Sequence, residues 1–122
     1  MNRIAKIVAA AFASAGLIAS AAACGGGQSA STGESGTVNV VASVNQWGTL
    51  AEELGGKNVE VASIVHTTNV DPHDYEPTTA DISKLQKAQV IVVNGADYDA
   101  WAVKAAKNTK ATVVNAAEVG GV

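Results

Sequence analysis

The chain has 122 residues, 48% of them apolar, and its eight lysines and arginines stand against eleven acids, for a formal net charge of −3. This acidic balance lacks the basic surface that nucleic-acid-binding proteins need, and it gives no indication of a polybasic membrane patch. The single cysteine excludes a disulfide within the chain.

The first residues have the pattern of an export signal. Arg3 and Lys6 give a positive start, and residues 7–18 are an almost unbroken apolar run. A helix that spans a bilayer needs about 20 apolar residues, so this run is too short for one. A positive start, a short apolar middle and small residues after it predict a secretory signal peptide.

Three alanines at residues 21–23 precede Cys24. This ending resembles a bacterial lipoprotein signal, in which the cysteine becomes the lipid-modified N-terminus, although Ala21 stands where leucine is usual. Ordinary cleavage that leaves Cys24 as a free thiol is the alternative. We expect residues 1–23 to be the signal peptide and residues 24–37, which are rich in Gly and Ser, to be a flexible tether. Residues 38–122 are then the folded part.

The folded part begins with a strand and a helix. Residues 38–42 are rich in valine and predict a strand. The next apolar residues fall at helical spacing and give one apolar face: Trp47, Leu50, Ala51 and Leu54. Residues 43–45 offer helix caps, and the glycine pair at 55–56 is typical of a helix end. Residues 59–65 predict a second strand.

Residues 66–77 have no periodicity and contain both prolines, so we expect a loop. Thr78 or Thr79 caps the next predicted helix, with Asp81 in its first turn, and Ile82, Leu85 and Ala88 form its buried face. The apolar run at 90–93 predicts a strand covered on both sides. A helix over 97–108 and a strand over 111–114 follow.

Strands that alternate with helices predict an α/β fold, with a parallel sheet and helices on both faces. Ligands of such sheets bind outside the carboxyl ends of the strands. The loop at 66–77 follows such an end and is the expected ligand site.

This loop also gathers groups that bind metals, in the run Asp-Pro-His-Asp-Tyr-Glu-Pro at residues 71–77. Imidazole suits zinc and other late first-row ions, and carboxylates also suit manganese. Pro72 stiffens the turn before His73 and so lowers the entropy lost when an ion binds. Taken from the residues alone, a single histidine among acids is more often simply solvated.

The run resembles the Asp-Pro-His-x-Tyr-Glu-Pro signature of zinc and manganese ABC-transporter substrate-binding lipoproteins. Its surroundings are similar too, including the Val-Ile-Val-Val-Asn-Gly strand end at 90–95 and the Tyr-x-x-Trp of Tyr98 and Trp101. The resemblance covers residues 38–122 and implies the N-terminal lobe of a bilobed receptor. The remaining ligands of that family would lie beyond Val122, which suggests a truncated chain.

The resemblance assigns roles to single residues. It implies that His73 is the first metal ligand, whereas His66 is an accessory or solvated histidine. Asp71 could add a carboxylate, although neighbours on one stiff turn rarely converge on one ion. Glu76 either orients the ligating imidazole or caps the following helix, and both readings stay open. Tyr98 and Trp101 are expected to pack rather than bind.

The implied function is a lipid-anchored receptor outside the cell membrane, without catalysis. It would capture Zn(II) or Mn(II) and deliver the ion to an ABC permease in the membrane. A surface adhesin of the same family is one alternative. A metallohydrolase fragment is another, although no His-Glu-x-x-His pair is present.

Overall fold

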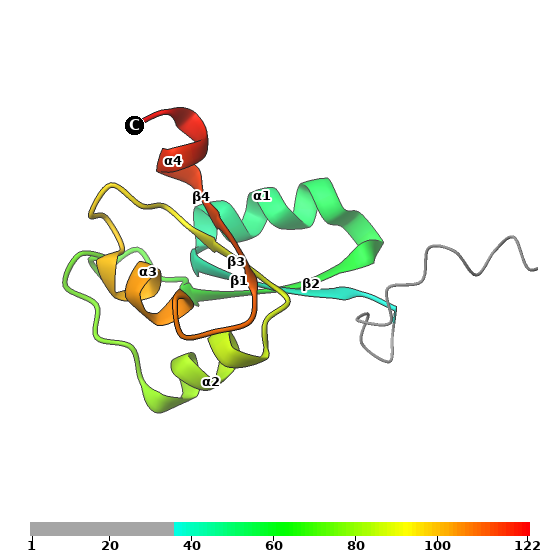
Figure 1. The fold of residues 1–122 in the computed structure, drawn as a ribbon, viewed down its shortest axis with the longest axis horizontal. Coiled ribbons are helices and arrows are strands. Elements are labelled where there is room, and N and C mark those ends of the chain that lie inside the picture. Colours follow the sequence, from blue (N-terminus) through cyan, green and yellow to red (C-terminus); the bar gives the residue numbers. More distant parts are fainter. Residues whose placement is uncertain (1–35) are drawn as a thin grey trace, which may run out of the picture. The chain divides into compact units, whose positions relative to one another are not determined.

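β1 (Val38–Val44) is the strand around which the sheet is built (Figure 1). The computed structural model describes residues 36–122. The predicted signal peptide, Cys24 and nearly all of the predicted tether lie outside the described residues. After β1 the elements are α1 (Asn45–Gly55), the 3₁₀ turn η2 (Gly56–Asn58), β2 (Val59–Val65), α2 (Thr79–Lys87), β3 (Val90–Val93), α3 (Ala100–Ala106), β4 (Thr112–Asn115) and α4 (Ala116–Gly120).

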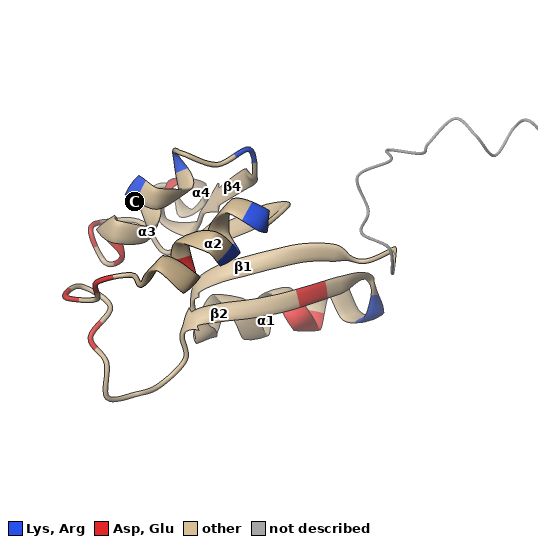
Figure 2. Ribbon diagram, turned by 90° about the horizontal axis from the view of Figure 1, so that it is seen from below, with Lys and Arg blue, Asp and Glu red and all other residues tan. Residues whose placement is uncertain are grey.

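The four strands form one sheet in the order β2-β1-β3-β4, and every neighbouring pair is parallel. Val40 pairs with Val61 on one side and with Val90 on the other. α1 lies on one face of the sheet, and α2 and α3 lie on the opposite face (Figures 1 and 2). The predicted α/β architecture is therefore confirmed.

The core lies mainly between the sheet and the α2–α3 layer. Its buried apolar residues are Val41, Val44, Ile64, Val65, Leu85, Ala88, Ile91, Val93, Ala102 and Ala106. β3 buries Ile91 and Val93 completely but leaves Val90 and Val92 partly exposed, so it is not covered on both sides as predicted. None of the helices in residues 36–122 has the length and apolar character needed to cross a membrane.

α2 begins as the sequence predicts. Thr78 is its N-cap, and a capping box joins it to Asp81. The Asp81 amide donates to Thr78 Oγ1 (3.2 Å), and the Thr78 amide donates to Asp81 Oδ2 (2.8 Å). Two amides that the helix itself cannot satisfy thus gain partners, which fixes where the loop ends and the helix starts.

α3 is shorter than predicted, because it starts at Ala100 instead of Asp97. Ala96 and Asp97 have positive φ angles of 49° and 61°, a left-handed conformation that a helix cannot contain. β4 is shifted by one residue from the prediction, and the short α4 was not predicted. Local periodicity carries little information about such brief elements.

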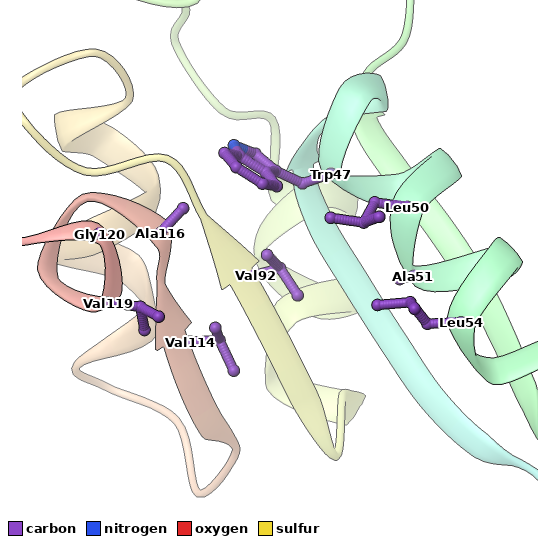
Figure 3. A pocket seen from close by; sticks show the side chains of 9 residues that line it. All are labelled: Trp47, Leu50, Ala51, Leu54, Val92, Val114, Ala116, Val119 and Gly120. Carbon is purple, nitrogen blue, oxygen red and sulfur yellow. The ribbon is translucent and has the colours of Figure 1, made fainter.

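The apolar stripe of α1 exists but is not buried as its pattern suggests. α1 buries Gly48 against β2, whereas Leu50 is 41% and Leu54 80% exposed. The stripe forms one wall of an apolar groove of about 430 Å³ over β3 and β4, and α4 forms the other wall (Figure 3). The residues that line it are Trp47, Leu50, Ala51, Leu54, Val92, Val114, Ala116, Val119 and Gly120.

Asp99 joins three of these elements and is 0% exposed. Its carboxylate accepts hydrogen bonds from the Ser43 hydroxyl near the end of β1 and from the amides of Asn94 (2.7 Å) and Gly95 (2.9 Å) after β3. Its own carbonyl accepts from the Ala102 amide in α3 (2.8 Å). The residue therefore fixes where α3 starts relative to the strand ends.

We expect Asp99→Asn to destabilise the fold by about 2–3 kcal/mol, because the amide turns one acceptor oxygen into a donor among buried donors. Urea denaturation measures this loss. Asp97→Asn is the matched control, since Asp97 is exposed and asparagine tolerates a positive φ. Equal stability of the two variants would contradict the role of Asp99.

Candidate metal centre

The loop at 66–78 leaves the carboxyl end of β2 and returns to α2, on the side of the sheet where the β3–α3 connection also lies. The two segments touch, because Trp101 Nε1 donates a hydrogen bond to the Pro72 carbonyl (2.9 Å). The candidate site therefore combines residues 71–75, here called the His73 turn, with the start of α3. It lies at the sheet edge where ligands of this architecture bind.

Asp71 orients His73 through two hydrogen bonds. Asp71 Oδ1 accepts from the His73 backbone amide (2.9 Å) and lies 2.8 Å from His73 Nδ1. The bond from the backbone amide, followed by the bond from the ring, lowers the pKa of Asp71 below its usual value. An ionised carboxylate only accepts, so Nδ1 carries a proton and the lone pair of the neutral ring is on Nε2. That nitrogen can bind a metal.

Two aromatic residues from the start of α3 hold the turn. The Tyr98 ring meets the His73 ring edge-on, with centroids 4.7 Å apart. Trp101 contacts the turn through its bond to Pro72, and its ring lies 5.0 Å from that of Tyr75. The His73 side chain is still 53% exposed, so the turn is held from behind while the imidazole faces solvent.

Tyr75 ties the far end of the turn to α2. Its hydroxyl donates to Asp81 Oδ2 (2.7 Å), which also accepts from the Thr78 amide and hydroxyl. Burial raises the pKa of Asp81, but the bonds from Tyr75 and Thr78 outweigh it and hold this pKa below the usual value. The same bond raises the pKa of the Tyr75 hydroxyl. Both groups therefore keep their donor and acceptor roles at neutral pH.

His73 opens onto a hollow of about 540 Å³ lined by residues 68–73 and Tyr98. This volume is far larger than a metal ion. Within residues 36–122, no three side chains of His, Cys, Asp or Glu gather closely enough to hold a metal. An ion on His73 would take its other ligands from water or from groups outside the described residues.

The other predicted site residues are arranged differently. His66 is exposed at the start of the loop, and its Nδ1 lies 3.1 Å from the Ile64 carbonyl. Glu76 is exposed. One of its two predicted roles was to cap α2, but that cap is formed by Thr78 and Asp81. Asp71 is the carboxylate that contacts the His73 imidazole.

The sequence of the chain matches a known family. The profile of the family described as "Zinc-uptake complex component A periplasmic" matches residues 40–122. The chain belongs to this family. The match covers the His73 turn and all of the sheet apart from the first two residues of β1.

Named relatives agree with this assignment. "Metal ABC transporter substrate-binding lipoprotein FimA" of Streptococcus parasanguinis is 33% identical over 88% of this chain and 34% of its own length. "Manganese ABC transporter substrate-binding lipoprotein scaA" of Streptococcus gordonii is 32% identical over 73% of this chain and 30% of its own length. The chain thus spans about a third of the length of the relatives that it matches.

Solved structures show the same fold. The "Metal-dependent Lipoprotein YcdH" of Bacillus subtilis superposes with a TM-score of 0.60 and 27% identity, over 67% of this chain and 32% of that one. The described residues therefore share the fold of about a third of that protein.

Sequence reasoning missed how the turn is supported. Tyr98 and Trp101 pack, as expected, but they pack on the candidate ligand and its turn. Ser43, expected to offer a helix cap, is buried and donates to Asp99. An acid in the first turn of the helix predicted over 97–108 was the one available signal for Asp99, and nothing in the sequence indicated its partners.

We expect Trp101→Phe to loosen the turn, because it removes the bond to Pro72 but keeps an aromatic ring beside Tyr75. One lost hydrogen bond is worth about 1 kcal/mol, so the His73 and Asp74 amides should exchange with solvent about fivefold faster. Amide exchange measured by NMR tests this.

Trp47→Phe is the matched control, since it loses a similar indole bond, to Asn94 Oδ1 (3.1 Å), away from the turn. Unchanged exchange in Trp101→Phe, or the same acceleration in both variants, would show that Trp101 does not hold the turn.

Proposed function

We propose that residues 38–122 are the N-terminal lobe of a substrate-binding component of a bacterial ABC importer for divalent metal ions. In this proposal His73 binds the transported ion through Nε2, and the protein passes the ion to a permease without chemical change. The observation that carries the proposal is the contact of Asp71 with His73 Nδ1, which leaves Nε2 free at an exposed position.

The contact has the form that metal sites use. A ligating histidine commonly donates its second ring N–H to a carboxylate, which fixes the tautomer and makes the imidazole a stronger ligand. The hydrogen bond from Trp101 to Pro72 and the contact of Tyr98 with the His73 ring also favour metal binding. A turn that is ordered before the ion arrives loses less entropy on binding.

The transported ion is Zn(II) or Mn(II) in this proposal. The family description refers to zinc, and the relative from Streptococcus gordonii is named for manganese. An imidazole suits zinc well, while the carboxylates of the same loop also suit manganese.

We test the ligand by isothermal titration with Zn(II) and Mn(II), using the full gene product that carries this sequence. His73→Ala should lower the affinity more than about 100-fold, because a lost ligand costs more than the 10–100-fold of a lost orienting partner. Asp71→Asn should fall within that smaller range.

His66→Ala is the matched control and should change the affinity less than about twofold, since His66 stands outside the turn. Unchanged affinity in His73→Ala would overturn the assignment. A loss as large in His66→Ala would show that the site is built differently.

The proposal includes a lipid anchor on Cys24 and a location on the outer face of the membrane. Both relatives are named lipoproteins, and the small residues before Cys24 fit lipoprotein processing. The anchor would keep a captured ion close to the permease.

Cys24→Ser should abolish incorporation of a radiolabelled fatty acid and release the protein from the membrane fraction. Ser20→Ala is the control, because it changes the leader but leaves the cysteine. Wild-type protein without label, or equal labelling of Cys24→Ser, would contradict the anchor.

A further inference from the structure

Five of the six lysines in residues 36–122 lie on α2, on α3 and on the connection from α3 to β4. They are Lys84, Lys87, Lys104, Lys107 and Lys110. All five are exposed, and Figure 2 shows them on the same side of the sheet, away from α1. We call this surface the lysine face.

Two of these lysines lie at the edge of the sheet where the strands start. Gln89 stands two residues after Lys87. Its backbone N–H donates to the backbone carbonyl of Asn39 in β1 (2.9 Å), and its backbone carbonyl accepts from the backbone N–H of Thr112 in β4 (2.9 Å). The Lys87 carbonyl itself accepts from Asn39 Nδ2 (3.2 Å). Lys87 and Lys110, which stands two residues before Thr112, are therefore held beside the first residues of the sheet.

Few exposed acids offset this charge. Asp81 and Asp99 belong to the same elements but are buried and hydrogen-bonded, and Asp97 is the exposed acid at the opposite end of α3. Glu60 of β2 is exposed and pairs in register with Asn39, whose side chain bonds the Lys87 carbonyl, so Glu60 lies on the same face as these lysines. The other acids of residues 36–122 are on α1, the loop and α4: Glu52, Glu53, Asp71, Asp74, Glu76 and Glu118. An acidic chain thus presents one basic side, which its composition did not indicate.

The predicted tether joins the fold at this same edge. All four strands are parallel, so they start at one edge, and β1 begins at Val38 directly after the tether. Cys24 stands 14 residues before Val38 in the sequence, so a lipid on it would tie the fold to the membrane through the end of the sheet where β1 starts, whereas the His73 loop follows the opposite ends of the strands.

We propose that the lysine face binds the anionic headgroups of the membrane and turns the His73 loop toward the medium. The orientation rests on the anchor proposed above, but the binding itself needs neither lipid nor metal. Each lysine near an anionic surface strengthens binding about fivefold. Five lysines without an apolar insertion give a weak contact that salt screens, so the lobe can leave the surface to meet a permease.

The test is co-sedimentation of the mature protein, from residue 24 onward and with Cys24→Ser, with phospholipid vesicles. Vesicles contain equal parts of phosphatidylglycerol and phosphatidylcholine, or phosphatidylcholine alone. We expect binding only to the anionic vesicles, and loss of binding as salt rises. Lys87→Gln should weaken binding about fivefold, and the combination of Lys84→Gln, Lys87→Gln, Lys107→Gln and Lys110→Gln should abolish it.

Lys57→Gln is the matched control, because Lys57 is exposed in η2 beyond the end of α1 and outside the lysine face. It should bind like the unsubstituted protein. Equal binding of the fourfold variant and the parent, equal loss in Lys57→Gln, or no preference for phosphatidylglycerol would overturn the proposal. Binding of the lysines to an acidic membrane protein, with none to the vesicles, would also overturn it. Since the assay contains no metal and no lipidated cysteine, its failure is separate from a failure of the His73 or Cys24 assignments.

Discussion

The buried carboxylate of Asp99 is the constraint on which the site depends. It accepts from Ser43 near the end of β1 and from two amides after β3, so it fixes the distance between neighbouring strand ends. The same residue precedes α3 and therefore sets where Tyr98 and Trp101 stand. These two side chains reach across to the His73 turn. The buried side chain that joins the strand ends thus also positions the candidate ligand, because a buried polar group is stable only where its hydrogen bonds are made.

The turn is ordered from three directions at once. Asp71 binds both the amide and the ring of His73 from within the turn, α3 holds it from the side, and Tyr75 ties its end to the cap of α2. Within residues 36–122, no buried side-chain polar atom lacks a partner. The imidazole contrasts with this satisfied surrounding, because the His73 side chain is half-exposed and lines the hollow. A turn that is already ordered around the imidazole loses little conformational entropy when a ligand binds.

The sequence predicted those features that local chemistry determines. Valine-rich runs predicted the strands, the threonine and aspartate of the capping box predicted the start of α2, and two prolines predicted the loop. It did not predict contacts between distant segments, such as the bond of Trp101 to Pro72 or the partners of Asp99. The exposure of the apolar stripe of α1 could not be predicted for the same reason. Periodicity shows that one side of a helix is apolar, but only the packing of the other elements decides whether that side is covered.

Parallel topology places the His73 loop and the ends of α2 and α3 at opposite edges of the sheet. All strands end where the His73 loop and the β3–α3 connection lie, and the exposed acids there are Asp71, Asp74, Glu76 and Asp97. The strands start where α1, α2 and α3 end. The ends of α2 and α3 carry lysines, which suit the negative end of a helix dipole, whereas the end of α1 carries Glu52 and Glu53. Carboxylates near the imidazole raise the local concentration of divalent cations, and a lysine in that position would repel them. Since loops and helix ends alternate along the chain, the acids of two loops and the lysines of two helix ends are kept apart without a separate domain. Topology decides where these segments lie, and the residues of each segment decide its charge.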